Sequence, residues 1–457
     1  MDVAVIGAGT AGLAAYRAAR AAGRRAVLIE AGPYGTTCAR VGCMPSKLLI
    51  AAADVAHAAR HGARFGVDAA VAVDGARVME RVRRERDRFV GFVVEGVDAI
   101  PADDRLRGRA TFVAPGALDV DGLRVTARSV VVATGSSPVV GDLFAPVRAR
   151  VDTSDDVFEW RALPSSVAVF GAGVIGLELG VALARLGVRV RIFGRGGAVG
   201  PLRDPVVREA ARAAIADEVP LLVDADVRDL RLVEGGAAVR FVDGGAEREE
   251  TFERVLVAAG RRPNVDGLGL ERAGVTLDDR GRPRVDRETM QAGTLPVFLA
   301  GDAAGDAPLL HEAADEGRIA GESAARFPEV TRGRRRSLLS IAFTSPQLAV
   351  VGASYAALAP LRDAGEVVIG EVSFDDQGRS RVMGENRGHL RVYAARDGRL
   401  LGAELAGPRA EHLGHLLAWS HQAGLTVGQM LEMPFYHPVV EEGLRTALRD
   451  AARQLSP

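Results

Sequence analysis

Two stretches of the chain match each other almost position for position. Residues 3–30 read VAVIGAGTAGLAAYRAARAAGRRAVLIE, and residues 167–194 read VAVFGAGVIGLELGVALARLGVRVRIFG. Each has an apolar strand pattern, a GxGxxG turn, a helical pattern and a second strand pattern. Because a strand, a helix and a second parallel strand form one βαβ unit, the repeat predicts two nucleotide-binding domains in one chain.

The first glycine-rich turn contains Gly7, Gly9 and Gly12. The first glycine permits the tight turn, the second lets the backbone approach a pyrophosphate, and the third brings the helix close to the strand. The helix that follows offers its N-terminal N–H groups and its positive dipole end to the phosphates. Glu30 ends the second strand, where a carboxylate can accept hydrogen bonds from ribose hydroxyls. Together these features predict dinucleotide binding.

The second turn has the same three glycines, Gly171, Gly173 and Gly176, but its second strand ends at Gly194, where an acid is expected. Arg195 follows directly. A missing acid beside an arginine favours the 2′-phosphate of NADP. Two observations point the other way. The GRGG sequence can be a plain surface loop, and glycine rather than alanine at position 176 favours NADH.

The rest of the chain alternates short apolar strands with helical patterns, which is typical of parallel sheets in an α/β fold. After about residue 332 the pattern changes to antiparallel strands and two helical patterns, which predicts a separate α+β domain. We read the basic runs RGRRR and RVRRERDR as a solvated linker and a solvated helix face. The expected domains are a first nucleotide-binding domain in two parts (1–142 and 263–331), a second one (143–262) and a C-terminal domain (332–457).

Composition narrows the class of protein. The formal net charge is -1, so no overall field attracts nucleic acid or an anionic membrane. The sequence has no apolar run of about 18 residues, the length needed to span a bilayer. The apolar start of the chain lacks the basic region of a signal peptide, since Asp2 follows Met1. Two cysteines do not make a secreted disulfide framework, so we expect a cytoplasmic protein.

Those two cysteines, Cys38 and Cys43, stand close together in the segment TTCARVGCMPSK. If Cys43 begins a helix and Cys38 lies in the loop before it, the two thiols can meet at disulfide distance. A helix N-terminus lowers the pKa of a thiol, and the thiolate is the reactive form. The alternative is two unrelated buried cysteines. A redox pair is the better interpretation because the chain has no other cysteine.

This segment resembles the redox-active segment of the flavin-dependent class I pyridine nucleotide–disulfide oxidoreductases, the group of dihydrolipoamide dehydrogenase, glutathione reductase and mercuric reductase. The resemblance covers essentially the whole chain, through GAGTAG, the cysteine segment, ATG, GAGVIG, GRRPN, GD and HPVVEE in that order. It implies an α/β fold with two Rossmann-like three-layer domains, one for FAD and one for NAD(P), and a C-terminal α+β dimerisation domain. It also implies an obligate homodimer.

The resemblance further implies roles for the matching residues. Lys47 would lie near the flavin N5 and pair with Glu178. The FAD-binding residues would be Gly7, Gly9, Gly12, Glu30, Lys47, Ala110, Thr134, Gly135, Asp302 and Leu310. The NAD(P)-binding residues would be Gly171, Gly173, Ile175, Gly176, Arg195, Val227 and Gly260. No metal site is expected.

His437 and Glu442 resemble the acid–base pair of this family, in which the histidine comes from the other subunit. An imidazole titrates near neutral pH, so it can take a proton from a thiol and return it. A carboxylate bonded to its other ring nitrogen would fix its orientation. The catalytic set implied is Cys38, Cys43, His437, Glu442, Lys47 and Glu178.

The segment LLHEAADEG, with His311, resembles dihydrolipoamide dehydrogenase at this point. We therefore expect a dihydrolipoyl dehydrogenase that reoxidises dihydrolipoamide with NAD⁺, with the lipoyl domain of a 2-oxo acid dehydrogenase complex as a candidate partner. The segments CMPSK and MPFYHP differ from the sequences that are most common at these points in dihydrolipoamide dehydrogenases. The alternatives are an NAD(P)H-dependent reductase of another small disulfide, a quinone or a metal ion, and a flavin-binding redox sensor without enzymatic activity.

Overall fold

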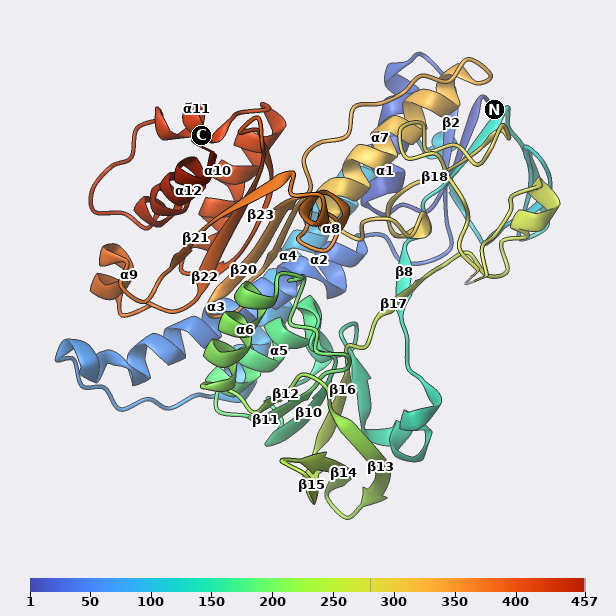
Figure 1. Cartoon of the computed structure of the whole chain (residues 1–457). Helices are drawn as coiled ribbons and strands as arrows, with labels where there is room; N and C mark the ends of the chain where they lie inside the picture. Colours follow the sequence, from blue (N-terminus) through green and yellow to red (C-terminus); the bar gives the residue numbers. More distant parts are fainter. Residues whose placement is uncertain (280, 456–457) are drawn as a thin grey trace. The chain divides into compact units, whose positions relative to one another are not determined.

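Figure 1 shows the chain as a computed structural model that describes residues 1–279 and 281–455. The chain divides into two units. Unit 1 comprises Met1–Pro45, Arg83–Val139 and Arg261–Arg336, and unit 2 comprises Ser46–Val82, Val140–Gly260 and Ser337–Pro457. Helices α3 (Cys43–Arg60) and α4 (Gly75–Asp98) each contribute residues to both units.

Unit 1 is built on a parallel five-stranded sheet in the order β18–β7–β1–β2–β3. Its core strands consist of Val, Ile, Leu, Ala, Ser and Phe, and β1, β7 and β18 are buried along their whole length. Such continuous burial is expected of parallel strands that are covered on both faces. The strands are β1 (Val3–Ile6), β2 (Ala26–Glu30), β3 (Arg105–Arg107), β7 (Ser129–Val132) and β18 (Val297–Leu299).

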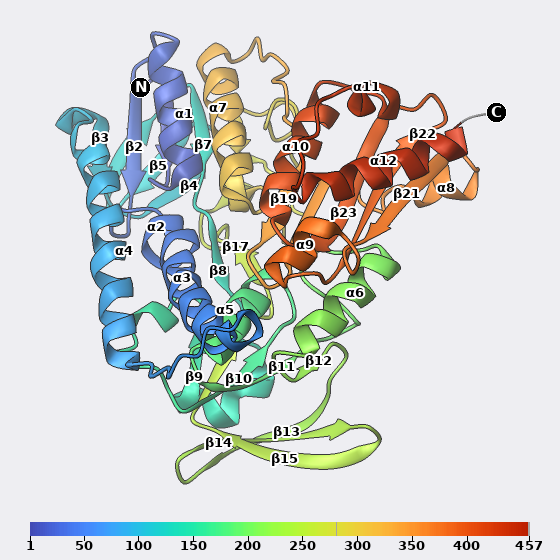
Figure 2. The same cartoon turned by 90° about the vertical axis from the view of Figure 1, so that its left-hand side faces the viewer.

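Helices α1 (Thr10–Ala21) and α7 (Leu310–Arg326) lie side by side in unit 1, as both views show (Figures 1 and 2). A Cβ atom at Gly317 would lie 2.2 Å from the carbonyl oxygen of Ala11, and one at Gly321 would lie 2.3 Å from that of Ala15. Glycine at these two positions therefore lets the helix backbones approach closely.

Smaller elements complete unit 1. An antiparallel sheet is formed by β4 (Ala110–Ala114), β5 (Ala117–Val120) and β6 (Leu123–Thr126). Strand β8 (Ser136–Pro138) pairs antiparallel with β17 (Arg261–Pro263), which joins chain segments far apart in the sequence. The short helix α2 (Thr37–Val41) precedes α3.

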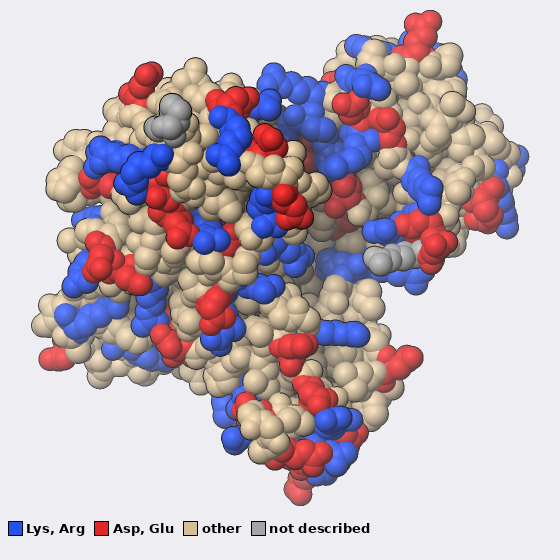
Figure 3. All heavy atoms as spheres, viewed as in Figure 1, with Lys and Arg blue, Asp and Glu red and all other residues tan. Residues whose placement is uncertain are grey.

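Unit 2 contains a second parallel sheet in the order β12–β11–β10–β16–β9. Its strands are β9 (Val151–Thr153), β10 (Ser166–Phe170), β11 (Arg189–Phe193), β12 (Leu221–Leu222) and β16 (Arg254–Val257), with helices α5 (Val174–Arg185) and α6 (Pro205–Ala216). An antiparallel sheet of β13 (Asp226–Val233), β14 (Gly236–Asp243) and β15 (Ala246–Phe252) follows. Figure 3 shows acidic and basic side chains interleaved on the visible face of this small sheet, and ion pairs join Arg228 with Asp226, Arg231 with Glu249 and Arg248 with Asp243.

The C-terminal part of unit 2 is an antiparallel sheet in the order β19–β20–β23–β22–β21, with α10 and α12 packed against it (Figure 2). Its apolar core includes Phe374, Leu405, Leu413 and Leu444. The strands are β19 (Leu339–Ala342), β20 (Gln347–Gly352), β21 (Val367–Ser373), β22 (His389–Ala395) and β23 (Leu400–Gly407). The helices are α8 (Ala359–Asp363), α9 (Gly378–Met383), α10 (Ala410–Gln422), α11 (Val427–Leu431) and α12 (Glu441–Leu455).

Two buried carboxylates join α6 to the C-terminal sheet within unit 2. Asp204, at the start of α6, accepts a hydrogen bond of 3.0 Å from the Tyr393 hydroxyl. Glu404 accepts bonds from the backbone N–H groups of Asp204, at 2.8 Å, and Tyr355, at 2.8 Å. Because both carboxylates are fully buried, these bonds offset the cost of removing them from water.

The predicted fold class is confirmed: two parallel-sheet domains of the Rossmann type and a C-terminal α+β domain. The domain limits given above remain a prediction. No helix among the described residues is both long and apolar enough to cross a bilayer.

Three local predictions were wrong. Cys38 lies in helix α2 rather than in a loop, because Thr36 caps this helix by accepting a hydrogen bond from the N–H of Ala39. Arg335, in the run predicted to be a solvated linker, forms ion pairs with buried carboxylates of α7. Arg86, in the run predicted to be a solvated helix face, is only 9% exposed.

Candidate active site

The first glycine-rich turn lies between β1 and α1 and has the shape that a pyrophosphate needs. Gly7 has a φ of 105°, and a Cβ atom there would lie 2.3 Å from the carbonyl oxygen of Ala133. A Cβ atom at Gly12 would lie 1.8 Å from the carbonyl oxygen of Gly7. At Gly9 nothing lies within 4 Å, so the space above the turn is open for a phosphate beside the start of α1.

Glu30 ends β2 beside this turn. One carboxylate oxygen accepts a hydrogen bond of 2.7 Å from the N–H of Ala8, and the other accepts one of 2.7 Å from the N–H of Gly32. These bonds hold the carboxylate at the carboxyl end of β2. They also brace the turn, a function that the sequence did not predict for this residue.

A second set of unit 1 residues surrounds Thr134 and Gly135. The Thr134 hydroxyl donates to the carbonyl oxygen of Asn264 at 2.7 Å, and the Asn264 amide donates to the carbonyl oxygen of Thr134 at 3.0 Å. Asp302 accepts a hydrogen bond from the Ser136 hydroxyl. Asn264 and Ser136 carry no predicted role, although Asn264 belongs to the GRRPN segment singled out in the sequence.

Two further predicted FAD residues lie at different depths of unit 1. Ala110 is buried in β4, whereas Leu310 begins α7 and is 45% exposed. His311 follows Leu310 and is half-exposed, and its Nε2 atom has no hydrogen-bond partner among the described residues.

The second turn, between β10 and α5, repeats the geometry of the first. A Cβ atom at Gly171 would lie 2.3 Å from the carbonyl oxygen of Ala258, and one at Gly176 would lie 1.9 Å from that of Gly171. Nothing lies within 4 Å of the corresponding point at Gly173. The turn can therefore hold a second pyrophosphate.

Gly194 fills the position at which an acid was expected. A Cβ atom there would lie 2.8 Å from the carbonyl oxygen of Val223 and 2.9 Å from the Cβ of Ala172, so a larger side chain would need the backbone to shift. Asp224, which the sequence did not single out, accepts a hydrogen bond of 2.7 Å from the N–H of Gly196. An acid is thus present at this edge of the sheet, but it comes from the loop after β12.

The other predicted NAD(P) residues lie around the same sheet of unit 2. Arg195 is exposed after β11, Ile175 is half-buried in the first turn of α5, and Val227 is half-buried in β13. Gly260 has a φ of 127° and an open space beside it.

Cys38 and Cys43 lie at consecutive helix starts. Cys38 is half-buried in α2, and Cys43 is exposed as the first residue of α3. Gly42 lies between the helices, and a Cβ atom there would lie 3.2 Å from the Cα of Cys38. The chain therefore folds back tightly between the two cysteines. Cys43 lies at the N-terminal end of the long helix α3, and the positive end of a helix dipole favours negative charge there.

Lys47 and Glu178 form an ion pair in unit 2. The Lys47 Nζ lies 2.9 Å and 2.8 Å from the two carboxylate oxygens of Glu178, whose side chain is 5% exposed. The backbone N–H of Phe343 donates to the same carboxylate at 2.9 Å, and the Lys47 Nζ lies 4.6 Å from the centre of the Phe343 ring. Phe343 lies in the loop after β19, and no local pattern marked it as a site residue.

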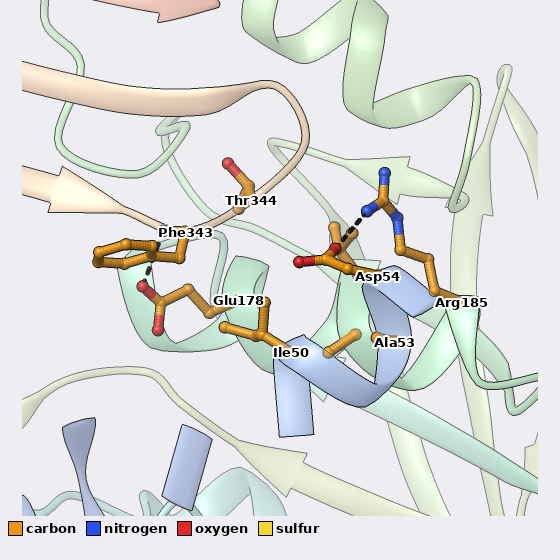
Figure 4. Close-up of a pocket in the computed structure, with 9 residues that line it drawn as sticks. Ile50, Ala53, Asp54, Glu178, Arg185, Phe343 and Thr344 are labelled. Atoms are coloured by element: carbon orange, nitrogen blue, oxygen red, sulfur yellow. Dashed lines mark hydrogen bonds and ion pairs between the residues drawn. The ribbon is translucent and has the colours of Figure 1, made fainter. Parts of the chain in front are cut away.

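A small cavity of about 10 Å³ adjoins this ion pair. Figure 4 shows Glu178 and Phe343 on one side of it and the ion pair of Asp54 with Arg185 on the other. A cavity of this size holds about one water molecule.

His437 and Glu442 are brought together at the start of α12. The His437 Nδ1 lies 3.0 Å from a Glu442 carboxylate oxygen, and Arg445 donates to the other oxygen at 2.8 Å. Desolvation tends to raise the pKa of Glu442, but hydrogen bonds from Val439 and His437 hold it below its ordinary value. The carboxylate stays ionised at neutral pH and can orient the imidazole, which is 82% exposed.

No group of three or more His, Cys, Asp and Glu side chains converges on a possible metal site within the described residues. Two dinucleotide-binding turns, a close cysteine pair and a histidine held by a carboxylate define the class of nucleotide-dependent thiol–disulfide oxidoreductases.

Comparison with known proteins identifies the family to which this chain belongs. Residues 1–317 match the pyridine nucleotide-disulphide oxidoreductase family, and residues 339–448 match its dimerisation domain. The chain is 30% identical to the dihydrolipoyl dehydrogenase of Thermus scotoductus, over 99% of this chain and 98% of that protein. It is 31% identical to the mercuric reductase of Acidithiobacillus ferrooxidans, over 100% of this chain and 83% of that protein. The chain therefore belongs to the pyridine nucleotide-disulphide oxidoreductase family.

Solved structures share the fold. The crystal structure of LpdA from Mycobacterium tuberculosis has a TM-score of 0.83 at 26% identity, over 98% of this chain and 99% of that chain. The HOCl-induced flavoprotein disulfide reductase RclA of Escherichia coli has a TM-score of 0.82 at 24% identity, over 98% of this chain and 99% of that chain. Membership of the family makes the protein an oxidoreductase that uses FAD and NAD(H), and the dimerisation domain supports a homodimer.

Proposed function

We propose that the protein is a dihydrolipoyl dehydrogenase, which oxidises dihydrolipoamide with NAD⁺ through Cys38 and Cys43. The observation that carries this proposal is the hydrogen bond between His437 and Glu442. A thiol substrate must lose a proton before it attacks a disulfide, and an exposed imidazole held by a carboxylate is suited to accept that proton. The many dihydrolipoyl dehydrogenases among the relatives support the same substrate.

Both nucleotide sites fit the cofactors of the family. FAD would bind at the turn of Gly7, Gly9 and Gly12, with Glu30, Ala110, Thr134, Gly135, Asp302 and Leu310 around it. NAD would bind at the turn of Gly171, Gly173 and Gly176, with Ile175, Arg195, Val227 and Gly260 around it. When bound, the flavin supplies the transfer of an electron pair between the dithiol and the nicotinamide.

The steps carried out by the chain's own residues are exchange and proton transfer. His437, supplied by the second subunit, takes a proton from one substrate thiol. The resulting thiolate attacks Cys38 in the Cys38–Cys43 disulfide, which forms a mixed disulfide and releases the Cys43 thiolate. The second substrate thiol displaces Cys38 and passes its proton to the departing Cys38 sulfur, while His437 keeps the first proton. The substrate leaves as a disulfide, and both cysteines are left reduced.

Lys47 and Glu178 act as a positioning pair in this proposal. The buried carboxylate of Glu178 holds the ammonium group of Lys47 in one place, and Phe343 fixes the carboxylate in turn. A fixed positive charge beside the flavin N5 would stabilise negative charge on the reduced ring.

The coenzyme and the partners are parts of the same proposal. We take NAD⁺ as the coenzyme because Asp224 supplies an acid near the end of β11, and NADP⁺ remains the alternative because Arg195 is exposed there. A lipoyl domain of a 2-oxo acid dehydrogenase complex would carry the dihydrolipoamide. The cytoplasm would be the place of action. The cysteine pair must alternate between its reduced and oxidised forms, and the cytoplasm does not hold cysteines in permanent disulfides.

A second candidate function is an NAD(P)H-dependent reductase of another small disulfide, a quinone or a metal ion. The relative that favours it is the mercuric reductase, whose likeness covers 100% of this chain and 83% of that protein. A quinone or metal-ion acceptor would have no need of His437.

A steady-state assay of the purified protein with dihydrolipoamide and NAD⁺, and then with NADP⁺, tests the proposal. We expect turnover with dihydrolipoamide, a preference for NAD⁺, and loss of nearly all turnover in a Cys43→Ser variant that still binds FAD. Serine cannot form the disulfide, but it fits the same helix start. Unchanged turnover of Cys43→Ser would reject the mechanism through the cysteine pair, whereas absence of turnover with either coenzyme would reject the substrate assignment.

A further inference from the structure

Four exposed arginines lie along one side of helix α4, which can be followed in Figure 2. They are Arg77, Arg81, Arg84 and Arg88, and we call this set the arginine face. Because an α-helix turns once in about 3.6 residues, their spacing places all four on one face of the helix. Since each residue adds about 1.5 Å, the arginine face extends over about 16 Å.

Few acidic side chains of the chain neutralise the arginine face. Arg84 lies 3.3 Å from Glu85, but its side chain is 63% exposed, and such a surface pair is weak and easily replaced. The other three arginines form no ion pair with a carboxylate among the described residues. Glu80 and Asp87 are exposed beside the face, and Asp87 pairs with the arginine that precedes it. The face therefore carries an excess of positive charge.

The arginine face ends beside an apolar cavity in unit 1, next to Cys38. This cavity has a volume of about 500 Å³, and α4 contributes Phe89, Phe92 and Val93 to its walls. Phe92 is also 55% exposed, so the cavity reaches the surface beside it. The guanidinium carbon of Arg88 lies 5.7 Å from the centre of the Phe92 ring. The last arginine of the face therefore lies beside the opening of the cavity.

The length and charge of the arginine face indicate the kind of partner that would bind there. Dihydrolipoamide has no charge, so four guanidinium groups spread over about 16 Å do not recognise the dithiol itself. A protein surface with several Asp and Glu side chains matches the face in both length and sign. If such a protein carried the dithiol on a flexible arm, the arm could enter the cavity while its surface lay on α4.

We infer that the arginine face of α4 binds an acidic carrier domain, whose covalently attached dithiol arm enters the cavity beside Cys38. The inference rests on the proposed function, because it takes a dithiol as the substrate. Within that function it names the class of partner, a domain with carboxylates around the point at which the arm is attached. Free dihydrolipoamide reaches the same cysteine without contact to the arginines.

Steady-state turnover of the holoenzyme with two forms of the dithiol tests this inference. The two substrates are free dihydrolipoamide and a recombinant lipoyl domain of negative net charge that carries the reduced lipoyl group. For the domain we expect kcat/KM to fall about tenfold between about 20 and about 300 mM NaCl, because salt screens the attraction between the two surfaces. For free dihydrolipoamide, kcat/KM should change less than about twofold.

The double variant Arg84→Gln with Arg88→Gln should lower kcat/KM for the lipoyl domain about fivefold at low salt and reduce its salt dependence. Turnover of free dihydrolipoamide should change less than about twofold, which shows that the variant is folded. The matched control is Arg124→Gln with Arg161→Gln, in β6 and in the loop before β10. Both are exposed and form no ion pair among the described residues, so we expect the control to behave as the wild type.

A binding measurement separates failure of this inference from failure of the proposed function. Calorimetry with the same domain in its unlipoylated form measures binding to the holoenzyme without any dithiol. We expect binding at low salt that is about fivefold weaker in the Arg84→Gln, Arg88→Gln variant and unchanged in the control.

Equal binding to the wild type and to this variant, or no binding to either, would overturn the inference whether or not dihydrolipoamide is turned over. Binding of a DNA duplex but not of the domain would overturn it in favour of nucleic acid. Dissociation of the variant into monomers, measured by sedimentation, would overturn it in favour of a contact between two copies of this chain. Absence of turnover with free dihydrolipoamide would instead reject the proposed function.

Discussion

Glu316 is a fully buried carboxyl group in helix α7 of unit 1. A guanidinium nitrogen of Arg335 lies 3.0 Å from a carboxyl oxygen of Glu316, 2.6 Å from one of Glu312 and 3.5 Å from one of Asp306. One guanidinium group therefore forms ion pairs with three carboxyl groups. Burial raises the pKa of Glu316 to about 7, and Arg335 acts in the opposite direction. The backbone N–H of Gly301 donates to the same carboxyl group, which connects it to the turn that carries the predicted FAD residue Asp302.

This carboxyl group should make stability depend on pH. Because the pKa of Glu316 is raised on folding, its protonated form contributes stability that is complete below the unfolded pKa and is lost as pH rises through about 7. From pH 4.5 to 7.5 we expect the wild type to lose about 3 kcal/mol more of its free energy of unfolding than Glu316→Gln does. Denaturant unfolding at several pH values measures the difference.

Glu322→Gln is the matched control for this measurement, because Glu322 lies in the same helix and pairs with Arg318 at the surface. Its pH profile should follow that of the wild type. Parallel profiles of the wild type and Glu316→Gln would contradict the prediction.

At the scale of elements, the contact of α1 with α7 depends on small residues. Gly317 and Gly321 face Ala11 and Ala15 so closely that neither glycine has room for a Cβ atom. Since α1 begins at the predicted FAD turn, this contact sets the position of the turn as well as the stability of unit 1.

Gly317→Ala should therefore lower the free energy of unfolding by about 1–3 kcal/mol and weaken FAD binding, because the new methyl group forces the two helices apart. Thermal unfolding and the flavin content of the purified protein measure the two effects. Gly91→Ala, in α4, is the control, because nothing lies within 4 Å of its Cβ position. We expect it to be neutral or slightly stabilising. A Gly317→Ala variant as stable as the wild type would show that the helices adjust without cost.

At the scale of the whole molecule, the dimer is the feature on which the proposed chemistry depends. The match of residues 339–448 to a dimerisation domain supports a homodimer, and His437 is 82% exposed in the isolated chain. If His437 transfers protons at the cysteines of the other subunit, each active site consists of cysteines from one chain and an imidazole from the other.

Co-expression of two inactive variants tests this arrangement. In a hybrid dimer of Cys43→Ser and His437→Gln, one site carries both changes and the other carries neither. Random pairing makes half of the dimers hybrid, so we expect about a quarter of the wild-type turnover with dihydrolipoamide. Each variant alone should be nearly inactive. Absence of any recovery in purified hybrid dimers would place cysteines and imidazole in the same chain.

Much of the fold and part of the candidate site could be predicted from local patterns. The two glycine-rich turns, the strands around them and the start of α3 at Cys43 each depend on residues close together in the sequence. The pairing of His437 with Glu442 was implied by the resemblance of this segment to the family's acid–base pair, and the structure places the two side chains in hydrogen-bond contact.

Other contacts could not be predicted, since they join residues distant in the sequence. The N–H of Phe343 reaches Glu178, and the hydroxyl of Thr134 reaches the backbone of Asn264, only because the chain folds back on itself. Arg335 was misread for the same reason: its short basic run resembles a solvated linker until α7 places buried carboxylates beside it.

The sequence by itself determined the two nucleotide-binding folds, because turn geometry and hydrophobic periodicity are properties of neighbouring residues, and it placed the two cysteines in a segment that resembles the redox-active segment of the family. Only the tertiary structure decided that Gly194 has no room for an acid, that Asp224 lies nearby instead, and that the arginine face of α4 ends at a cavity beside Cys38. Space, burial and charge pairing arise from packing between distant segments, and no local pattern encodes them.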